Sequence, residues 1–190
     1  MGSEQHESKS IANDLLWEEI RQGNKKALAA IFNKYFDSLY GYGYRIVAND
    51  QKVRDAIQEV FYQLWKYRER LTEVQSVRAY LFVSLRREIL NEKSASVRRE
   101  KRHEEYSLEE FQIHFKYDKW VEVLDIKKEK KGKVKEAIKG LTPRQREAIF
   151  LKYFEGLSTQ EMTGVMQVRA QSIYNILSDA IKKLRNILNK

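Results

Sequence analysis

The amino-acid sequence predicts an all-α protein made of two small helical domains joined by a linker. Pro143 is the only proline and eight glycines occur in 190 residues, so few positions would interrupt a helix. Apolar residues recur at spacings of three and four over long stretches, as they do along one face of a helix. Alternation of apolar and polar residues, which is typical of strands, is scarce. These observations together favour an all-helical fold.

Four helices are predicted in the first domain, with a turn at Gly23–Asn24 after the first of them. The third carries apolar residues along one side, while Asp55, Gln58, Glu59 and Tyr62 line the other. That polar face is either a surface for docking a protein or simply a solvated side. The four helices are expected at about 13–22, 25–47 and 51–71, and from about 77 through Leu90, where the sequence becomes polar and basic.

The helical pattern weakens from Ser94 to about Lys133, and the domain break is expected there. A basic run at 97–102 is followed by an acidic patch at 104–110. Aromatic residues continue through this stretch, so it is more than a plain disordered tether.

The second domain carries sharper helix signals. Thr142, followed by Pro143 and by Gln145 three residues after the cap, is typical of a helix start with a capping box. Ser158 and Glu161 repeat the pattern one helix later. A short turn at Gln167–Val168 then leads into a last helix from about Ala170 to Leu188.

A short capped helix, a tight turn and a longer helix with a polar start are typical of a DNA-binding helix-turn-helix. The second helix of such a motif enters the major groove, where arginine and asparagine pair with guanine and adenine edges. Basic residues further along would meet phosphates. An ordinary helical hairpin with a polar face is the alternative. The candidate base contacts are Arg169, Gln171, Ser172, Tyr174 and Asn175, and the candidate phosphate contacts are Lys182, Lys183 and Arg185.

The fourth helix interleaves arginines with aromatic residues and follows a polar loop. Aromatic rings stack on unpaired bases while basic groups follow the backbone, so this helix could hold single-stranded DNA. The alternative is that Tyr80 and Phe82 are core residues and the arginines keep the surface soluble. From the residues alone the alternative is favoured. The arginines in question include Arg78, Arg86 and Arg87.

Charge and composition favour some classes of protein over others. Lys and Arg number 36 against 27 Asp and Glu, a net charge of +9 that favours a polyanionic partner such as nucleic acid or an acidic membrane surface. There is no cysteine and the three histidines are scattered, so neither a disulfide nor a zinc site is expected, and no cofactor is predicted. No phosphate-binding glycine loop or nucleophile–base pair points to an enzyme. No signal peptide and no apolar run of about 18 residues occur, so a cytoplasmic protein without membrane insertion is expected.

Four short sequence motifs, in this order along the chain, resemble motifs of the extracytoplasmic-function (ECF) sigma factors of the sigma-70 superfamily. Asp55–Trp65 (DAIQEVFYQLW) resembles region 2.2, and Val77–Phe82 (VRAYLF) the start of the helix containing regions 2.3 and 2.4. Leu141–Glu147 (LTPRQRE) with Tyr153–Ser158 (YFEGLS) is similar to the start of region 4, and Ala180–Arg185 (AIKKLR) to its last helix. The resemblance implies region 2 at 11–100, a linker at 101–132 and region 4 at 133–188.

The resemblance also implies a function and a set of partners. Such a factor directs core RNA polymerase to specific promoters and assists DNA melting, while the polymerase supplies the catalysis. Region 4 would read the −35 element in duplex form and rest on the flap of the second-largest subunit. An anti-sigma factor is a further partner that the family implies. Asp55, Gln58, Glu59 and Gln63 would face the clamp helices of the largest subunit, and a base flipped out of the −10 element would meet Leu71, Arg78, Tyr80, Ser84, Arg86 and Arg87.

Several positions depart from the family pattern. Arg87 stands where asparagine is frequent, so a different −10 preference is expected. Gln167 stands at the turn position where the family usually has glycine, and Thr163 stands where a small alanine is usual. Ile176 stands where many members have an arginine that would contact DNA. The fold of region 4 is therefore a firmer expectation than any single base contact.

Two other functions fit parts of the sequence. The first is a regulator that binds duplex DNA through a C-terminal helix-turn-helix, like response-regulator output domains, without programming the polymerase. Residues 1–100 show nothing resembling a receiver domain. The second is a helical adaptor that does not bind DNA, which leaves the charge surplus unexplained.

Overall fold

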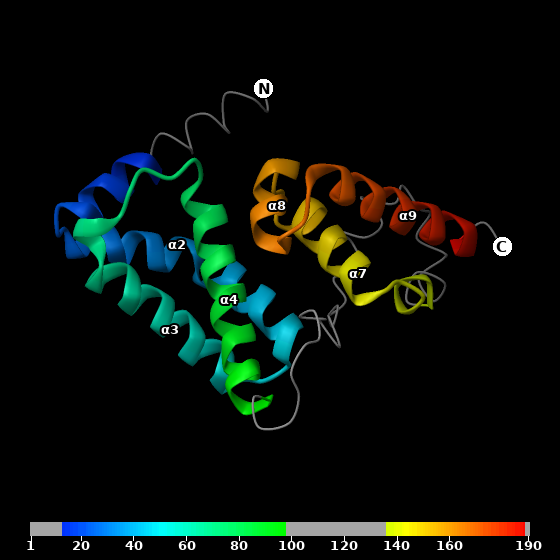
Figure 1. Ribbon diagram of the computed structural model, residues 1–190, viewed down its shortest axis with the longest axis horizontal. Coiled ribbons are helices and arrows are strands. Elements are labelled where there is room, and N and C mark those ends of the chain that lie inside the picture. Colours follow the sequence, from blue (N-terminus) through cyan, green and yellow to red (C-terminus); the bar gives the residue numbers. More distant parts are fainter. Residues whose placement is uncertain (1–12, 98–135, 189–190) are drawn as a thin grey trace. The chain divides into compact units, whose positions relative to one another are not determined.

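The structure, a computed structural model, describes residues 13–97 and 136–188 (Figure 1). All the regular elements in these two ranges are helical, which confirms the predicted all-α fold. The chain divides into two compact units, one containing most of the first range and the other containing the second. The predicted linker at 101–132 and both predicted domain boundaries lie outside the described residues.

The first unit begins with a helix over residues 13–21, which ends where Gly23 adopts a left-handed backbone (φ +87°). Two long helices follow it, and the side chain of Asn49 caps the second by accepting a hydrogen bond from the amide of Lys52 at 3.0 Å. The elements after residues 13–21 are α2 (Lys25–Val47), α3 (Asp50–Lys66), the 3₁₀ turn η1 (Arg68–Arg70) and α4 (Val77–Val97).

The prediction that the third helix reaches Leu71 is wrong. The α-helix ends at Lys66 because Tyr67 leaves helical geometry (φ −104°, ψ 16°) while its amide still donates to the carbonyl of Gln63. Arg68 then turns back over the ring of Trp65, with 4.7 Å between guanidinium carbon and ring centroid. The chain therefore leaves the helix axis before the loop at 71–76.

Close packing around Gly43 joins the long helices of the first unit. A β-carbon at Gly43 would lie 2.9 Å from Cγ1 of Val53 and 3.1 Å from Cδ1 of Ile89, so α2 meets side chains of α3 and α4 at one level. Tyr42 and Phe82 are fully buried, with 5.1 Å between ring centroids. Burying a ring of this size contributes about 1.5–3 kcal/mol.

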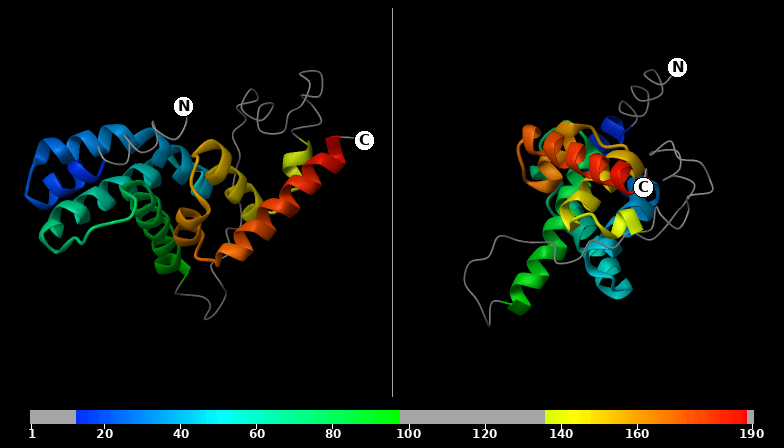
Figure 2. Two further views of the ribbon diagram at one scale, coloured as in Figure 1. Left: turned by 90° about the horizontal axis from the view of Figure 1, so that it is seen from above. Right: turned by 90° about the vertical axis from the view of Figure 1, so that its right-hand side faces the viewer.

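The described part of the second unit starts with a helical turn at 136–139, and both predicted capping boxes are present in this unit. Thr142 pairs reciprocally with Gln145, and Ser158 pairs with Glu161. The helix α7 packs against α9 (Figures 1 and 2). The remaining elements are α7 (Pro143–Ile149), the π-helical turn η3 (Phe150–Phe154), α8 (Thr159–Met166) and α9 (Ala170–Leu188).

The helix that starts at Pro143 ends in a π turn, η3, and not in a regular α-helical turn. The amide of Glu155 bonds to the carbonyl of Phe150 at 3.0 Å, which is the wider spacing of a π turn. Gly156 (φ +66°) then reverses the chain. The core of this unit packs α9 against the elements before it, through Ala137, Ile138, Leu141, Ile149, Ala180 and Leu184.

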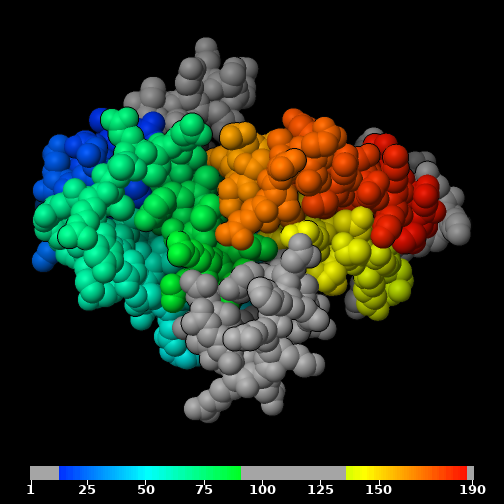
Figure 3. Space-filling view, in the orientation of Figure 1, coloured from blue at the N-terminus to red at the C-terminus, as the bar shows by residue number. Residues whose placement is uncertain are grey.

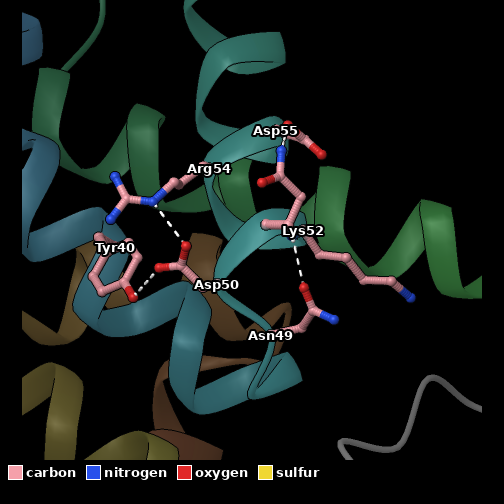
Figure 4. A network of polar contacts seen from close by, with 7 residues as sticks. Tyr40, Asn49, Asp50, Lys52, Arg54 and Asp55 are labelled. Atoms are coloured by element: carbon pink, nitrogen blue, oxygen red, sulfur yellow. Dashed lines mark hydrogen bonds and ion pairs between the residues drawn. The ribbon is translucent and has the colours of Figure 1, made fainter.

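A polar network joins α2 to α3 on the surface of the first unit (Figure 4). The hydroxyl of Tyr40 donates to Asp50 at 2.5 Å, and Arg54 donates to the other carboxylate oxygen at 3.0 Å. The bond from Tyr40, and then the one from Arg54, lower the pKa of Asp50, while the bond to Asp50 raises the pKa of Tyr40. The arginine also lies over the Tyr40 ring, 5.1 Å from its centroid.

Replacing Tyr40 with phenylalanine should raise the pKa of Asp50 toward its ordinary value, because the largest cause of the lowering is removed. The folded pKa of Asp50 lies below its unfolded value. Its stabilising contribution is therefore present above the ordinary aspartate pKa and is lost as pH falls through the lowered one. Carboxyl-carbon NMR titration of both proteins measures the change. Tyr62→Phe, an exposed tyrosine on α3, is the control, and an unchanged Asp50 pKa in Tyr40→Phe would contradict the expectation.

Candidate nucleic-acid interface

Helices α8 and α9 form a helix-turn-helix. Gln167 ends α8 in the left-handed conformation (φ 54°, ψ 44°), with its amide donating to the carbonyl of Thr163. Residues 167–169 make the whole connection, and the carbonyl of Arg169 accepts bonds from the amides of Ser172 and Ile173 at 2.9 and 3.2 Å. The predicted start of the last helix at Ala170 is therefore confirmed.

The polar start of α9 lies on the surface. Ile173 is buried, and Tyr174 beside it is 56% exposed. In Figure 3, α8 and the beginning of α9 form one continuous orange surface. A shallow depression is lined by residues of both helices and of the turn between them, including Gln160, Arg169 and Ser172. Of the predicted −35 contacts, Arg169, Gln171, Asn175, Lys182 and Lys183 are also exposed, and Ser172 is half-buried.

Two contacts already orient side chains on this surface. Gln171 donates to Asn175 at 3.0 Å, four residues further along the same helix. Lys183 lies 3.4 Å from the side-chain oxygen of Gln145 on α7. The arrangement offers amide, guanidinium and ammonium donors along one helix, which is chemistry suited to base edges and phosphates. DNA contact by each of them stays a prediction.

The predicted −10 residues fall into three groups in the first unit. Arg87 is exposed, whereas Leu71, Arg78, Tyr80 and Ser84 are half-buried. Arg86 is only 5% exposed, so its burial argues against the predicted DNA contact. On a helix, neighbouring residues point about 100° apart, so Arg86 and Arg87 cannot share a face.

Phe82, which was considered for stacking on bases, is a core residue with no exposed surface. The alternative interpretation of the sequence is thus confirmed for Phe82. Tyr80 is half-buried, and its ring meets the ring of Trp17 at 4.9 Å in an edge-to-face arrangement. This contact could not be predicted, because Trp17 lies on the first helix and no recognisable motif surrounds it in the sequence.

The polar face of α3 is opposite its buried side. Six residues of this helix are buried, from Val53 to Leu64. On the other face Asp55 accepts a bond from Gln51 at 2.9 Å, and Glu59 accepts one from Gln63. Of the predicted polymerase contacts, Asp55 and Gln58 are exposed, and Glu59 and Gln63 are half-buried.

Within residues 13–97 and 136–188 no helix combines the length and apolarity needed to span a membrane. The same ranges hold no group of three or more side chains suited to a metal ion.

Comparison with known proteins identifies the family. The model of sigma-70 region 2 matches residues 31–103, and the model of sigma-70 region 4 matches residues 131–184. The ECF RNA polymerase sigma factor SigK of Mycobacterium ulcerans (strain Agy99) is 23% identical over 175 residues, which cover 92% of each chain. The chain belongs to the ECF sigma-70 family. SigK of Mycobacterium sp. (strain JLS) is 24% identical over 179 residues, with 92% of this sigma factor and 90% of the relative covered.

Two solved structures share the fold of this sigma factor. CnrH, solved in complex with the cytosolic domain of CnrY, matches with a TM-score of 0.61 at 18% identity, covering 94% of this chain and 97% of the other. The sigma factor RpoE of Bartonella quintana, solved with the anti-sigma factor NepR, matches with a TM-score of 0.57 at 19% identity, covering 86% and 98%. The sigma factor therefore directs RNA polymerase, with core polymerase and promoter DNA as its partners, and a regulator independent of polymerase is not favoured.

Proposed function

We propose that this sigma factor reads promoters with two separate units and has no enzymatic activity of its own. Region 2 would occupy 11–100 and region 4 133–188, with 101–132 as the linker. The observation that carries this proposal is the helix-turn-helix of α8 and α9 with an exposed polar start, in a chain where region 2 precedes region 4. We also propose that the factor acts in the cytoplasm, where it would bind core polymerase.

The −35 element would be read by the first two turns of α9. Arg169 and Asn175 can each make bidentate contacts to a base edge, worth about 1–3 kcal/mol of discrimination. Gln171 holds Asn175 through its amide, which fixes the asparagine before DNA arrives. Lys182 and Lys183 would meet phosphates and set the position of the helix.

The −10 element would be opened by the loop at 71–76 and the following helix. Flipping a base out of the stack costs a few kcal/mol, which a pocket and stacking can offset. Leu71 would supply an apolar wall and Tyr80 an aromatic one, while Arg78, Ser84 and Arg87 would bind the strand. Arg86 is left out of this set because it is buried.

The polar face of α3 would anchor the factor to the clamp helices of the polymerase. Asp55, Gln58, Glu59 and Gln63 form this face, and the bond from Gln63 to Glu59 keeps the carboxylate in place. An acidic and amide-bearing surface in a protein of net charge +9 suits a basic protein partner better than DNA.

We also propose that an anti-sigma factor restrains this protein. The support is the fold shared with CnrH and RpoE, whose structures contain CnrY and NepR. A restraining partner of this kind would compete with polymerase or promoter DNA for the same surfaces.

Transcription of sheared genomic DNA with core polymerase of the same bacterium tests the proposal. With the sigma factor added, sequencing of RNA 5′ ends should find starts that share paired elements near −35 and −10. Core polymerase alone is the control. Binding of the protein to duplex DNA without any such starts would instead indicate a conventional regulator.

A further inference from the structure

Trp17 connects three parts of the first unit. Its ring is 3% exposed, and its indole N–H donates to the backbone carbonyl of Thr72, 55 residues away, at 3.1 Å. Its ring meets that of Tyr80 at 4.9 Å and 67°. One side chain of the first helix therefore touches both the loop at 71–76 and the helix that follows.

The loop is also held at its two ends. Before it, Arg68 stacks on Trp65 and donates to the carbonyl of Trp65 at 3.1 Å. After it, the hydroxyl of Ser76 accepts the amide of Ala79 at 3.2 Å and starts α4. Between these ends, the bond to Thr72 is the contact that ties the loop backbone to the first helix.

The first helix is itself firmly placed. Asn13 donates to the hydroxyl of Tyr35 at 2.8 Å and accepts from Lys34 at 2.5 Å, which ties the helix to α2. Ile20 is fully buried one turn after Trp17. The indole thus extends from a fixed support toward a loop that has no regular hydrogen bonding of its own.

We propose that Trp17 is a positioning residue for recognition of the −10 element. By holding the Thr72 carbonyl and the Tyr80 ring, it fixes the loop at 71–76 relative to the start of α4, where a flipped base would bind. A loop ordered before DNA arrives loses less conformational freedom on binding. The inference rests on the proposed role of this loop, and Trp17 lies outside the residues 31–103 that match region 2.

Trp17→Phe tests the inference, because it keeps an aromatic ring against Tyr80 and removes the donor to Thr72. The probe is forked promoter DNA with 2-aminopurine at successive non-template positions of the −10 element, bound by holoenzyme. Wild type should give a fluorescence rise at the flipped position. Loss of one hydrogen bond should weaken capture at that position by about three- to tenfold, while the signal at the other positions and the dependence on the −35 element stay the same.

Leu15→Ala is the matched control, since Leu15 lies on the same helix and is 63% exposed. It should behave as wild type. Thr72→Gly, at an exposed residue of the loop, keeps the backbone carbonyl that accepts the indole bond but makes the loop backbone more flexible, so it should weaken the signal at the same position.

Three outcomes would overturn the inference. Equal signals in Trp17→Phe and wild type would remove the proposed role of Trp17 and leave that of the loop. A uniform loss at all positions together with a lower melting temperature would make Trp17 a general stabiliser of the fold. Absence of any rise in wild type would instead remove the proposed role of the loop, and the inference with it.

Discussion

Replacing Gln58 and Glu59 together with alanine should weaken binding to core RNA polymerase by roughly 30-fold, which corresponds to about 2 kcal/mol for the loss of central interface contacts. Gln58 is exposed, and Glu59 accepts the bond from Gln63 on the face opposite the buried side of α3. Neither substitution opens a cavity in the core, so the melting temperature should hardly change. Titration of labelled protein with core polymerase, followed by anisotropy, measures the affinity.

A matched control lies on the neighbouring helix. Asn33 and Asp37 are an exposed amide and carboxylate on α2, and their double alanine variant should bind polymerase as wild type does. Because the defect is one of affinity, excess Gln58/Glu59 double variant should restore transcription by mass action. Wild-type affinity in the double variant would remove α3 from the proposed polymerase interface.

Replacing Arg169 and Asn175 together with alanine should lower initiation from −35-dependent promoters by at least about 30-fold, since each bidentate contact contributes about 1–3 kcal/mol. Both side chains are exposed at the start of α9, so the fold of the second unit should persist. Abortive transcription from one promoter with an intact and with a scrambled −35 element measures the effect. The variant should show the same low activity on both templates.

Arg144 and Asn186 supply a control of the same two residue types in the same unit. Both are exposed and lie outside the predicted recognition surface, so their double alanine variant should keep full discrimination between the two templates. If the Arg169/Asn175 variant also discriminated as well as wild type, another part of the chain would have to read the −35 element.

Local signals predicted the parts of the fold that depend on neighbouring residues. The capping boxes at Thr142 and Ser158 each need only a side chain three residues later, so both could be predicted from sequence. The π turn after Ile149 could not, because its spacing of apolar residues differs little from that of an α-helix. The end of α3 at Lys66 likewise depends on how Arg68 packs on Trp65.

The candidate site shows the same division. The helical period of α9 leaves Asn175 outside when Ile173 is inside. Arg169 stands four residues before Ile173 and is exposed because it lies in the turn before the helix. Arg86 and Arg87 are equally basic in sequence, but Arg86 lies on the side of the buried Phe82 and Ile89, whereas Arg87 lies outside it. The contact from Trp17 to Thr72 spans 55 residues, a separation at which sequence periodicity carries no information.

The backbone of Gln167 has a consequence for the lifetime of the second unit. A residue with a β-carbon in the left-handed region gives up about 1 kcal/mol relative to glycine, and the turn between α8 and α9 accepts this loss. A loss of that size raises the unfolded fraction of a small domain roughly fivefold. The second unit is thus least stable when the factor is unbound. Promoter DNA and polymerase bind its folded form, so they lower its unfolded fraction and lengthen its lifetime in the cell.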